Sequence, residues 1–500
     1  MSNYFYNLLK IFMINKISNT GFNFDNSYIE LPPEFYSPAN LQPVKSPQLV
    51  ILNNELSNSL GLNTDFLKSQ EGIYIMSGNI KIPDGAYISQ AYAGHQFGGF
   101  TMLGDGRALL IGEQITPSNQ RFDIQLKGSG RTPYSRNGDG RAVLGPMLRE
   151  YIISEAMHGL KIPTTRSLSV ISTGENVYRE TIQQGAILTR VASSHIRFGT
   201  FEYAAYMLDY EKLKKLSDYT IKRHFPFLEN NENKYINLLD EVIKLQASLV
   251  AKWQSVGFIH GVLNTDNMSI CGETIDYGPC AFMDVYNPDT VFSSIDTNGR
   301  YAYKNQIAIV NWNLYRLAET LLPIINLDEN KAIELAQNSL SKFINLATSN
   351  LSHEMCSKIG IFEPKTSDID LLNELLNMMQ KYKEDYTNTF IALTFNDLPQ
   401  KGMFISEEFI NWKKKWEETL TLQNKSKDEV FDLMKNSNPA VIPRNHRVEE
   451  ALSAANNRDF SVMNNLLKAL SNPFEHSEFQ KEYAKLPSTP QCNYRTYCGT

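Results

Sequence analysis

Hydrophobic positions follow different periods in the two halves of the chain. Between residues 73 and 190, short apolar runs alternate with glycine-rich turns, as in ISQAYAGHQFGGFTMLGDGRALLIGEQ, and this pattern predicts short strands. After about residue 195, apolar residues recur at the helical period of 3.6. The clearest predicted helices are 203–216, 235–256, 305–325, 330–349, 368–394 and 406–423.

These patterns divide the chain into four predicted segments. Residues 1–72 are punctuated by Pro and Asn and predict an ordered arm rather than a core element. Residues 73–194 predict a small, mixed, β-rich N-lobe with a nucleotide-binding loop, and 195–424 a larger helical C-lobe with a metal-binding catalytic loop. Residues 425–500 form a helical C-terminal extension. This order is that of a two-lobed, protein-kinase-like α+β fold, an analogy that concerns the fold alone.

A lysine and a glutamate in the predicted N-lobe have the spacing of a known ion pair. The strand FDIQLK ends on Lys127, and the helix GPMLREYIISEAMHGL follows it, with Pro146 near its start and Gly159 near its end. Kinases fix a strand lysine with a helix glutamate. Glu150 has the right helical phase for this pairing, and Glu155 on the same helix is the alternative.

Residues 260–278, HGVLNTDNMSICGETIDYG, carry the strongest candidate chemistry. Asn267 and Asp276 come in the order of the two metal ligands of a kinase. Mg²⁺ takes one or two such oxygen ligands from a protein and completes its shell with phosphates. Val262 occupies the position of the usual kinase base, so Asp266 is the nearest carboxylate able to replace it.

Two glycine-rich stretches are further candidates for contact with a nucleotide. Gly104, Gly106 and Arg107 lie between two apolar strands, where glycines admit a phosphate to the backbone; an ordinary hairpin turn is the alternative. Asp139 and Gly140 belong to a polar run between the Lys127 strand and the next helix. That run is predicted either as a lid touching the nucleotide or as a surface loop.

Arg190 ends the predicted strand AILTR, and Arg197 follows seven residues later, near the junction of the lobes. Guanidinium groups bind phosphate oxygens in bidentate fashion, so the two arginines are candidates to hold a terminal phosphate. Surface salt bridges are the alternative for each of them.

Composition narrows the classes of function. The chain has 500 residues and carries 48 Lys and Arg against 54 Asp and Glu, which is not the basic footprint of a nucleic-acid binder. No stretch approaches the roughly 20 apolar residues of a membrane span. The five cysteines show no CxxC spacing. We therefore expect a cytoplasmic protein without nucleic-acid or membrane partners.

The motifs quoted above resemble those of the selenoprotein O family, kinase-like pseudokinases that act as protein adenylyltransferases. The resemblance begins at FDNSYIELPPEFY, includes FDIQLKGSGRTPYSRNGDGRAVLGPMLREY and NPAVIPRNHRVEEAL, and reaches a cysteine third from the end. It implies that ATP binds in reversed orientation and that AMP passes to Ser, Thr or Tyr hydroxyls of other proteins, releasing pyrophosphate. The resemblance further implies Asp266 as proton acceptor, Asn267 and Asp276 as ligands of Mg²⁺ or Mn²⁺, and nucleotide contacts at Gly104, Gly106, Arg107, Lys127, Asp139, Gly140, Arg190, Arg197 and Asp276.

One feature departs from the family. Some members are thought to link the C-terminal cysteine to a cysteine after the DYG segment, but 291–295 reads VFSSI here, so Cys498 lacks that partner. Two other functions stay open at this point: a kinase that uses Asp266 as its base, and a non-catalytic nucleotide-binding pseudokinase. Val262 is evidence against the first, and the full set of metal and phosphate residues is evidence against the second.

Overall fold

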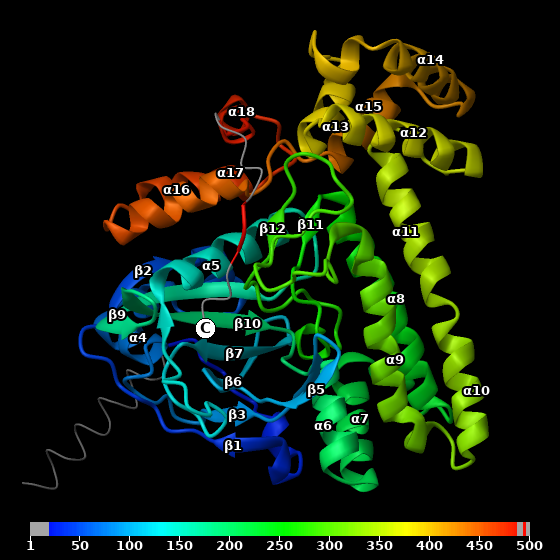
Figure 1. The fold of residues 1–500 in the computed structure, drawn as a ribbon. Coiled ribbons are helices and arrows are strands. Elements are labelled where there is room, and N and C mark those ends of the chain that lie inside the picture. Colours follow the sequence, from blue (N-terminus) through cyan, green and yellow to red (C-terminus); the bar gives the residue numbers. More distant parts are fainter. Residues whose placement is uncertain (1–19, 488–493, 497–500) are drawn as a thin grey trace, which may run out of the picture.

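An antiparallel sheet forms the centre of the N-lobe in the structure, a computed structural model that describes residues 20–487 and 494–496 (Figure 1). The strand order is β1 (Tyr36–Pro38), β3 (Ile88–Gln90), β6 (Ala108–Ile115), β7 (Arg121–Lys127), β10 (Ile182–Ala192), β9 (Arg166–Tyr178) and β2 (Gln48–Leu52), while β8 (Ala142–Val143) pairs with β10 beside this path. A separate hairpin, β4 (Ala93–Gln96) and β5 (Gly99–Met102), lies next to the sheet and reaches the C-lobe.

The segment predicted as an arm supplies both edge strands of this sheet, β1 and β2. Three short helices follow β2: α2 (Asn54–Ser59), α3 (Thr64–Lys68) and α4 (Gln70–Met76). Leu60 and Leu67 in this region are fully buried with residues of β6 and β7. These residues are therefore core elements, contrary to the expectation of an arm outside the core, because their apolar runs are too short to stand out by period. The boundary at residue 72 stays a prediction.

Helix α5 (Leu144–Gly159) confirms the helix predicted between Pro146 and Gly159. One side packs on β9 and β10, and the other is covered by α16 (Asn445–Asn456) and α17 (Ser461–Leu470) of the C-terminal extension (Figure 1). This double cover explains why α5 is buried on nearly all sides, including the polar residues Arg149 and Glu150.

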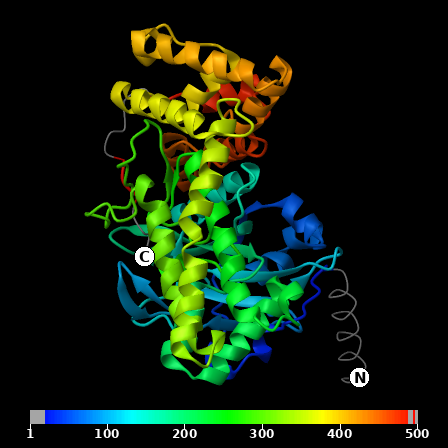
Figure 2. The ribbon, with the colours of Figure 1, turned by 90° about the vertical axis from the view of Figure 1, so that its right-hand side faces the viewer.

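The C-lobe is helical, as predicted. Predicted helices 235–256, 305–325 and 406–423 are confirmed as α8 (Lys234–Ser255), α9 (Gln306–Ile325) and α14 (Glu407–Leu422). Figure 2 shows the long helices of this lobe running side by side along one flank of the molecule. The two-stranded ladder of β11 (Phe258–Ile259) and β12 (Ala281–Phe282) brackets the catalytic loop.

Each of the other three predicted helices is broken into two. The breaks separate α6 (Phe198–Met207) from α7 (Tyr210–His224), α10 (Glu329–Leu340) from α11 (Phe343–Ser357), and α12 (Thr366–Tyr382) from α13 (Tyr386–Phe395). Asp209 caps the start of α7 by accepting a hydrogen bond from the backbone of Lys212. Lys383 ends α12 in a left-handed conformation with φ of 57°. The helical spacing of apolar residues continues through all three breaks, so this spacing did not reveal where the helices end.

A second hydrophobic core lies at the end of the C-lobe far from the sheet, where α12, α13, α14 and α15 (Lys427–Ser437) meet (Figure 1). Trp412 and Trp416 stack there with ring centroids 5.5 Å apart.

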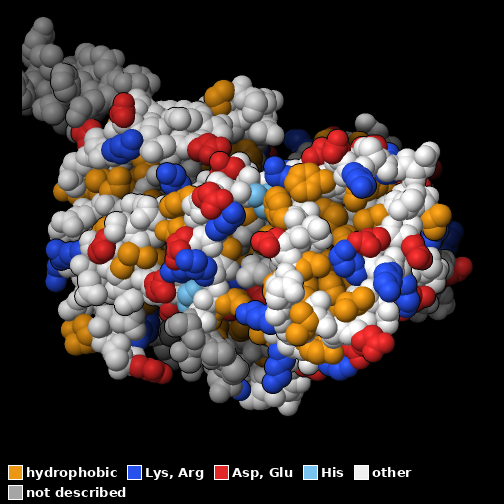
Figure 3. All heavy atoms as spheres, turned by 90° about the horizontal axis from the view of Figure 1, so that it is seen from above, with side chains coloured by type: hydrophobic (Ala, Val, Ile, Leu, Met, Phe, Trp, Pro, Cys, Tyr) orange, Lys and Arg blue, Asp and Glu red, His pale blue; other side chains and the backbone are white. Residues whose placement is uncertain are grey.

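On the face shown in Figure 3, basic and acidic side chains are interspersed. Helix α18 (Glu478–Tyr483) closes the described extension. Throughout 20–487 and 494–496, we find no helix with the length and apolarity needed to span a membrane.

Candidate active site

A pocket of about 470 Å³ lies between the N-lobe sheet and the catalytic loop of the C-lobe. The pocket brings together residues that were predicted from the sequence to share one site, although they lie up to 170 positions apart in the chain. Of the predicted site residues, those that line it are Gly106, Arg107, Lys127, Arg190, Arg197, Asp266, Asn267 and Asp276.

The sheet presents its charged residues to this pocket from two neighbouring strands. Lys127 pairs with Leu188 across β7 and β10, and Gln125 pairs with Arg190. Because side chains alternate between the two faces of a strand, Gln125, Lys127 and Arg190 lie on one face. The Arg190 guanidinium also lies 3.4 Å from the Gln125 side-chain oxygen.

Glu150 of α5 fixes both cations of that face. Its carboxylate accepts hydrogen bonds from Lys127 Nζ at 2.6 Å and from Arg190 Nη2 at 2.5 Å. Glu155 instead pairs with Arg166 at 2.7 Å. The predicted Lys127–Glu150 pair is therefore confirmed. This strand lysine held by a helix glutamate, above a catalytic loop, is the arrangement of a protein kinase.

Asp276 is the point at which the cations of the pocket meet. Its Oδ1 lies 2.6 Å from Arg190 Nη2 and 3.2 Å from Lys127 Nζ, and its Oδ2 accepts a short hydrogen bond from Arg197. Burial alone would raise the pKa of Asp276, but these three positive charges outweigh it and hold the pKa well below its usual range. Its backbone is left-handed, with φ of 61°, a strained conformation typical of functional sites.

Two hydrogen bonds hold the catalytic loop in place. His260 Nε2 donates to the carbonyl of Ile275 at 2.9 Å, which ties the loop to the residue before Asp276. Asn267 donates through Nδ2 to the carbonyl of Val262 at 2.9 Å, which leaves the amide oxygen for another contact. Val262 itself lines the pocket with an apolar side chain, so the position of the kinase base carries no carboxylate.

The oxygens of Asn267 and Asp276 fit a hard divalent cation. One amide oxygen and one carboxylate match the small number of protein ligands that Mg²⁺ uses when phosphates complete its shell. The part of the chain that the structure describes holds no cluster of three or more His, Cys, Asp or Glu suited to a metal. Binding of a metal by Asn267 and Asp276 stays a prediction.

Asp266 is buried beside the pocket. Burial raises the pKa of Asp266 to about 6, although the charge of Arg197 acts in the opposite direction. Gln96 Nε2 donates to its Oδ2 at 3.3 Å, while its Oδ1 has no hydrogen-bond partner among the described residues. Arg197 Nη1 donates to the backbone carbonyl of Asp266 at 2.6 Å. A carboxylate with this pKa is ionised at neutral pH and can accept a proton.

The sequence did not indicate two residues of this site, Gln96 and Asp105. Asp105 lines the pocket, is buried, and accepts hydrogen bonds from Gln125 at 3.0 Å and from the backbone of Gln90 at 3.3 Å. Its carboxylate lies 3.9 Å from Arg197. Asp105 could have been found from its position between Gly104 and Gly106 in the predicted phosphate-binding turn. No sequence pattern around Gln96 indicates that it belongs to the site.

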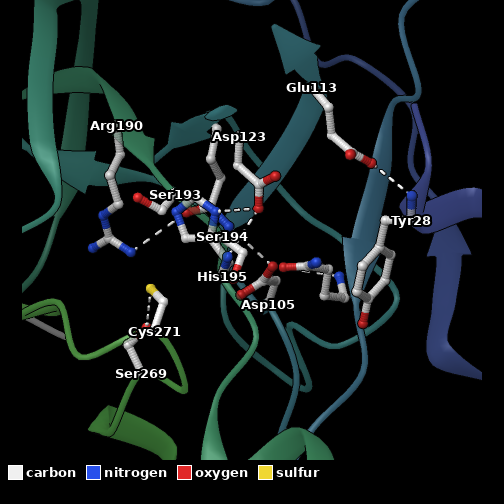
Figure 4. Close-up of polar contacts among 12 residues, drawn as sticks. Tyr28, Asp105, Glu113, Asp123, Arg190, Ser193, Ser194, His195, Ser269 and Cys271 are labelled. Atoms are coloured by element: carbon white, nitrogen blue, oxygen red, sulfur yellow. Dashed lines mark hydrogen bonds and ion pairs between the residues drawn. The ribbon is translucent and has the colours of Figure 1, made fainter. Parts of the chain in front are cut away.

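A buried polar network behind the pocket positions the turn that carries Arg197 (Figure 4). Asp123 of β7 accepts hydrogen bonds from the backbone and from Nδ1 of His195, at 2.9 and 3.0 Å. Arg223 of α7 donates to the other oxygen of Asp123 at 2.6 Å. This network joins the strand of Lys127 to the C-lobe and so fixes the position of Arg197 relative to Lys127.

Three predicted nucleotide contacts are not among the residues that line the pocket. Gly104 has φ of 113°, and a Cβ there would lie 2.5 Å from the ring of Tyr134. Asp139 is exposed, and its carboxylate binds Arg179 at 2.9 Å. Gly140 has φ of 67° and accepts a backbone hydrogen bond from Gly130. Contact of these three residues with a nucleotide stays a prediction.

The last described residues lie against the segment that follows the catalytic loop. Thr496 donates from its backbone to Phe292 at 2.8 Å and accepts from Ser294 at 3.0 Å, and its hydroxyl donates to the carbonyl of Pro279. Cys498 lies outside the described residues. Residues 494–496 thus contact the 292–294 segment through backbone hydrogen bonds.

Comparison with known proteins assigns these features to one family. A sequence model described as protein adenylyltransferase SelO matches residues 19–471. The protein nucleotidyltransferase YdiU of Bacillus cytotoxicus is 62% identical over 487 residues, which cover 97% of this chain and 99% of that protein. The protein of the same name from Clostridium beijerinckii is 60% identical over 484 residues, covering 97% of this chain and 99% of that protein.

A solved structure was also matched, "ROP2 from Toxoplasma gondii: A virulence factor with a protein-kinase fold and no enzymatic activity". The match covers 67% of this chain and 88% of that chain at 8% identity and a TM-score of 0.23.

Proposed function

The chain belongs to the SelO family of protein adenylyltransferases, and from that premise we propose that its pocket binds ATP and moves AMP onto a Ser, Thr or Tyr hydroxyl of a protein, releasing pyrophosphate. The observation that carries the proposal is that the catalytic loop has its carboxylate at Asp266 and not at Val262, the position of the kinase base. Val262 places an apolar side chain at the kinase base position, while Asp266 presents a carboxylate with a raised pKa beside the pocket. The cytoplasm, our proposed compartment, supplies both ATP and acceptor proteins.

Four cationic side chains line the pocket in which we propose that the phosphates of ATP bind: Arg107, Lys127, Arg190 and Arg197. Arg190 and Arg197 are buried, so water screens their charges weakly and each phosphate contact is strong. In the reversed orientation that we propose, these arginines bind the terminal phosphates and the α-phosphate faces Asp266.

Asn267 and Asp276 would hold Mg²⁺, with Mn²⁺ as the alternative ion. When bound, the cation supplies positive charge to the phosphate oxygens as negative charge develops on them.

The reaction needs one proton acceptor, and we assign that role to Asp266. The acceptor oxygen forms a bond to the α-phosphorus while the bond from that phosphorus to the β-phosphate oxygen breaks, and pyrophosphate leaves. The hydroxyl proton passes to Asp266, whose pKa of about 6 keeps it ionised before the step. Gln96 donates to Oδ2, while the buried Oδ1 has no hydrogen-bond partner among the described residues.

The decisive experiment supplies the protein with ATP labelled at either the α- or the γ-phosphate, together with Mg²⁺ and a cell extract. We expect label on protein from the α position only, lost in Asp276→Ala and in Lys127→Ala. As a matched control, Asp432→Ala removes an exposed carboxylate from α15 and should leave labelling unchanged.

Each other outcome contradicts the proposal in a different way. Label retained only from the γ position would make the protein a kinase. Label absent from both positions, with ATP still bound, would favour a non-catalytic nucleotide-binding protein.

A further inference from the structure

A continuous set of ring contacts runs over the surface from α6 towards the pocket. Tyr206, in the last turn of α6, meets Phe100 of β5 edge to face, with centroids 5.4 Å apart. Phe100 contacts His95 of β4 at 5.5 Å, and His95 contacts Trp312 of α9 at 5.6 Å. The hairpin, α6 and α9 are thus joined by aromatic side chains, and His95 also contacts the Glu202 carboxylate of α6 at 2.8 Å.

The set continues from α9 to the pocket itself. The Arg300 guanidinium lies 4.9 Å from the ring centroid of Trp312 and 5.7 Å from that of the buried Tyr301. Tyr301 in turn contacts Phe97 at 5.2 Å, and Phe97 lines the pocket. Phe97 and Ile295 are the most exposed lining side chains, which places the solvent opening of the pocket on this side.

This surface leaves apolar area in contact with water. The exposed fractions are 46% for Tyr206, 41% for Phe100 and 42% for Phe97, and Trp312 is half-buried. Contiguous exposed apolar area of this kind marks interaction sites, and Trp, Tyr and Arg are the residues enriched at binding hot spots.

The charged groups of this surface include one guanidinium without an ion pair. Asp296 accepts hydrogen bonds from the backbone of Arg300 and Tyr301, whereas the Arg300 guanidinium forms no ion pair with a described carboxylate. Arg316 also lies over Trp312, at 5.1 Å, but pairs with Glu319 at 2.6 Å. Arg300 is therefore the cation able to meet a partner's carboxylate.

We propose that Tyr206, Phe100, Trp312, Arg300 and Phe97 form an acceptor surface, which binds the extended segment of the acceptor protein around its reacting hydroxyl. An aliphatic or aromatic side chain of that segment packs on Phe100 and Tyr206, and an acidic one meets Arg300. The inference rests on the proposed function, because it takes the bound segment to be the one that receives AMP.

The position of the surface relative to Asp266 supports this assignment. Gln96, which donates to the Asp266 carboxylate, is adjacent to Phe97 on the same hairpin. A segment lying on Phe100 and Phe97 therefore ends within a few residues of the proposed proton acceptor. Holding the acceptor here supplies the positioning that a phosphoryl-type transfer needs.

The test uses arrayed peptides with a central Ser, Thr or Tyr and one varied flanking position, scored for binding by fluorescence polarisation and for transfer of α-labelled AMP. We expect the wild-type protein to prefer peptides with an acidic flank and an apolar flank. Arg300→Glu should reverse the charge preference towards a lysine flank. Tyr206→Ala should raise the acceptor KM about tenfold, a loss of roughly 1.4 kcal/mol, while the KM for ATP is unchanged.

Matched controls and two readouts separate this inference from the proposed function. Phe227→Ala removes an exposed aromatic ring elsewhere, and Lys215→Glu reverses an exposed charge on α7; both should bind peptides as the wild type does. An Arg300→Glu protein that melts normally and ranks acidic and basic peptides like the wild type would overturn the acceptor surface, as would absence of peptide binding. Charge-selective binding without AMP transfer would count against the proposed function and leave the surface standing.

Discussion

A Cβ atom on Gly94 would lie 2.7 Å from Oδ1 of Asp266, closer than such atoms pack in proteins. The glycine of the β4–β5 hairpin thereby lets the backbone rest directly on the proposed proton acceptor. Gly94→Ala must displace either the hairpin or the carboxylate. Because a misplacement of about 1 Å can cost about 100-fold in rate, we expect AMP transfer to fall by that order while ATP binding is retained.

The control for this substitution lies on the same hairpin. A Cβ on Gly99 would meet its nearest neighbour, the carbonyl of Gln96, at an ordinary 3.6 Å. Gly99→Ala should therefore keep near wild-type transfer. Equal rates for the two variants, measured with α-labelled ATP, would show that close packing on Asp266 does not matter for the reaction.

The pH dependence of transfer should report the pKa of Asp266. The carboxylate must be ionised to accept a proton, so with a pKa of about 6 the rate should rise with pH through that value and then level off. Gln96→Leu removes the hydrogen bond that favours the ionised form, so its profile should shift to higher pH. A profile with unchanged midpoint but lower plateau would assign Gln96 a purely structural role.

Replacing Asp266 should separate stability from activity. Its folded-state pKa of about 6 exceeds the ordinary value of 3.8, so the folded protein binds the proton more tightly than the unfolded chain and stability falls as pH rises between these values. Asp266→Asn should abolish transfer yet raise the free energy of unfolding by on the order of 1–2 kcal/mol at neutral pH. Thermal melts should show that gain disappear near pH 4.

Glu150 should be needed for both folding and ATP binding, whereas Glu155 should matter only for folding. Glu150→Gln leaves buried Lys127 and Arg190 with Asp276 as their remaining carboxylate, and breaking such a buried pair typically costs about 3–5 kcal/mol. Glu155→Gln weakens the contact with Arg166 and should lower stability without changing ATP affinity. Denaturant unfolding and ATP titration on both variants check this; equal ATP affinities would contradict it.

The parts of the site that the sequence predicted are those fixed by local periodicity. Lys127 ends a strand, Glu150 follows at helical phase, and the pair forms as expected. Asn267 and Asp276 are close in sequence and follow a strongly periodic helix, α8. In these cases the spacing along the chain determines the placement in space.

The parts that the sequence missed depend on contacts between distant segments. Gln96 reaches Asp266 across 170 positions, and no pattern in either stretch indicates the other. The convergence of Arg190 and Arg197 on Asp276 likewise depends on how β10 docks on the catalytic loop. Helix ends at Asp209 and Lys383 were missed because single-residue caps interrupt helices without interrupting the apolar period.

The three cations around Asp276 have a consequence for how the protein responds to its ligands. In the binding mode that we propose, phosphates would draw Lys127, Arg190 and Arg197 away from the Asp276 carboxylate, and a cation on that carboxylate would free the three side chains for phosphate. The site would then work as an ion exchanger, because each ligand would displace the groups that compete with the other. By thermodynamic reciprocity, the factor by which Mg²⁺ tightens ATP binding equals the factor by which ATP tightens Mg²⁺ binding. The occupancy of the enzyme would therefore follow the joint supply of metal and nucleotide, more steeply than it follows either one alone.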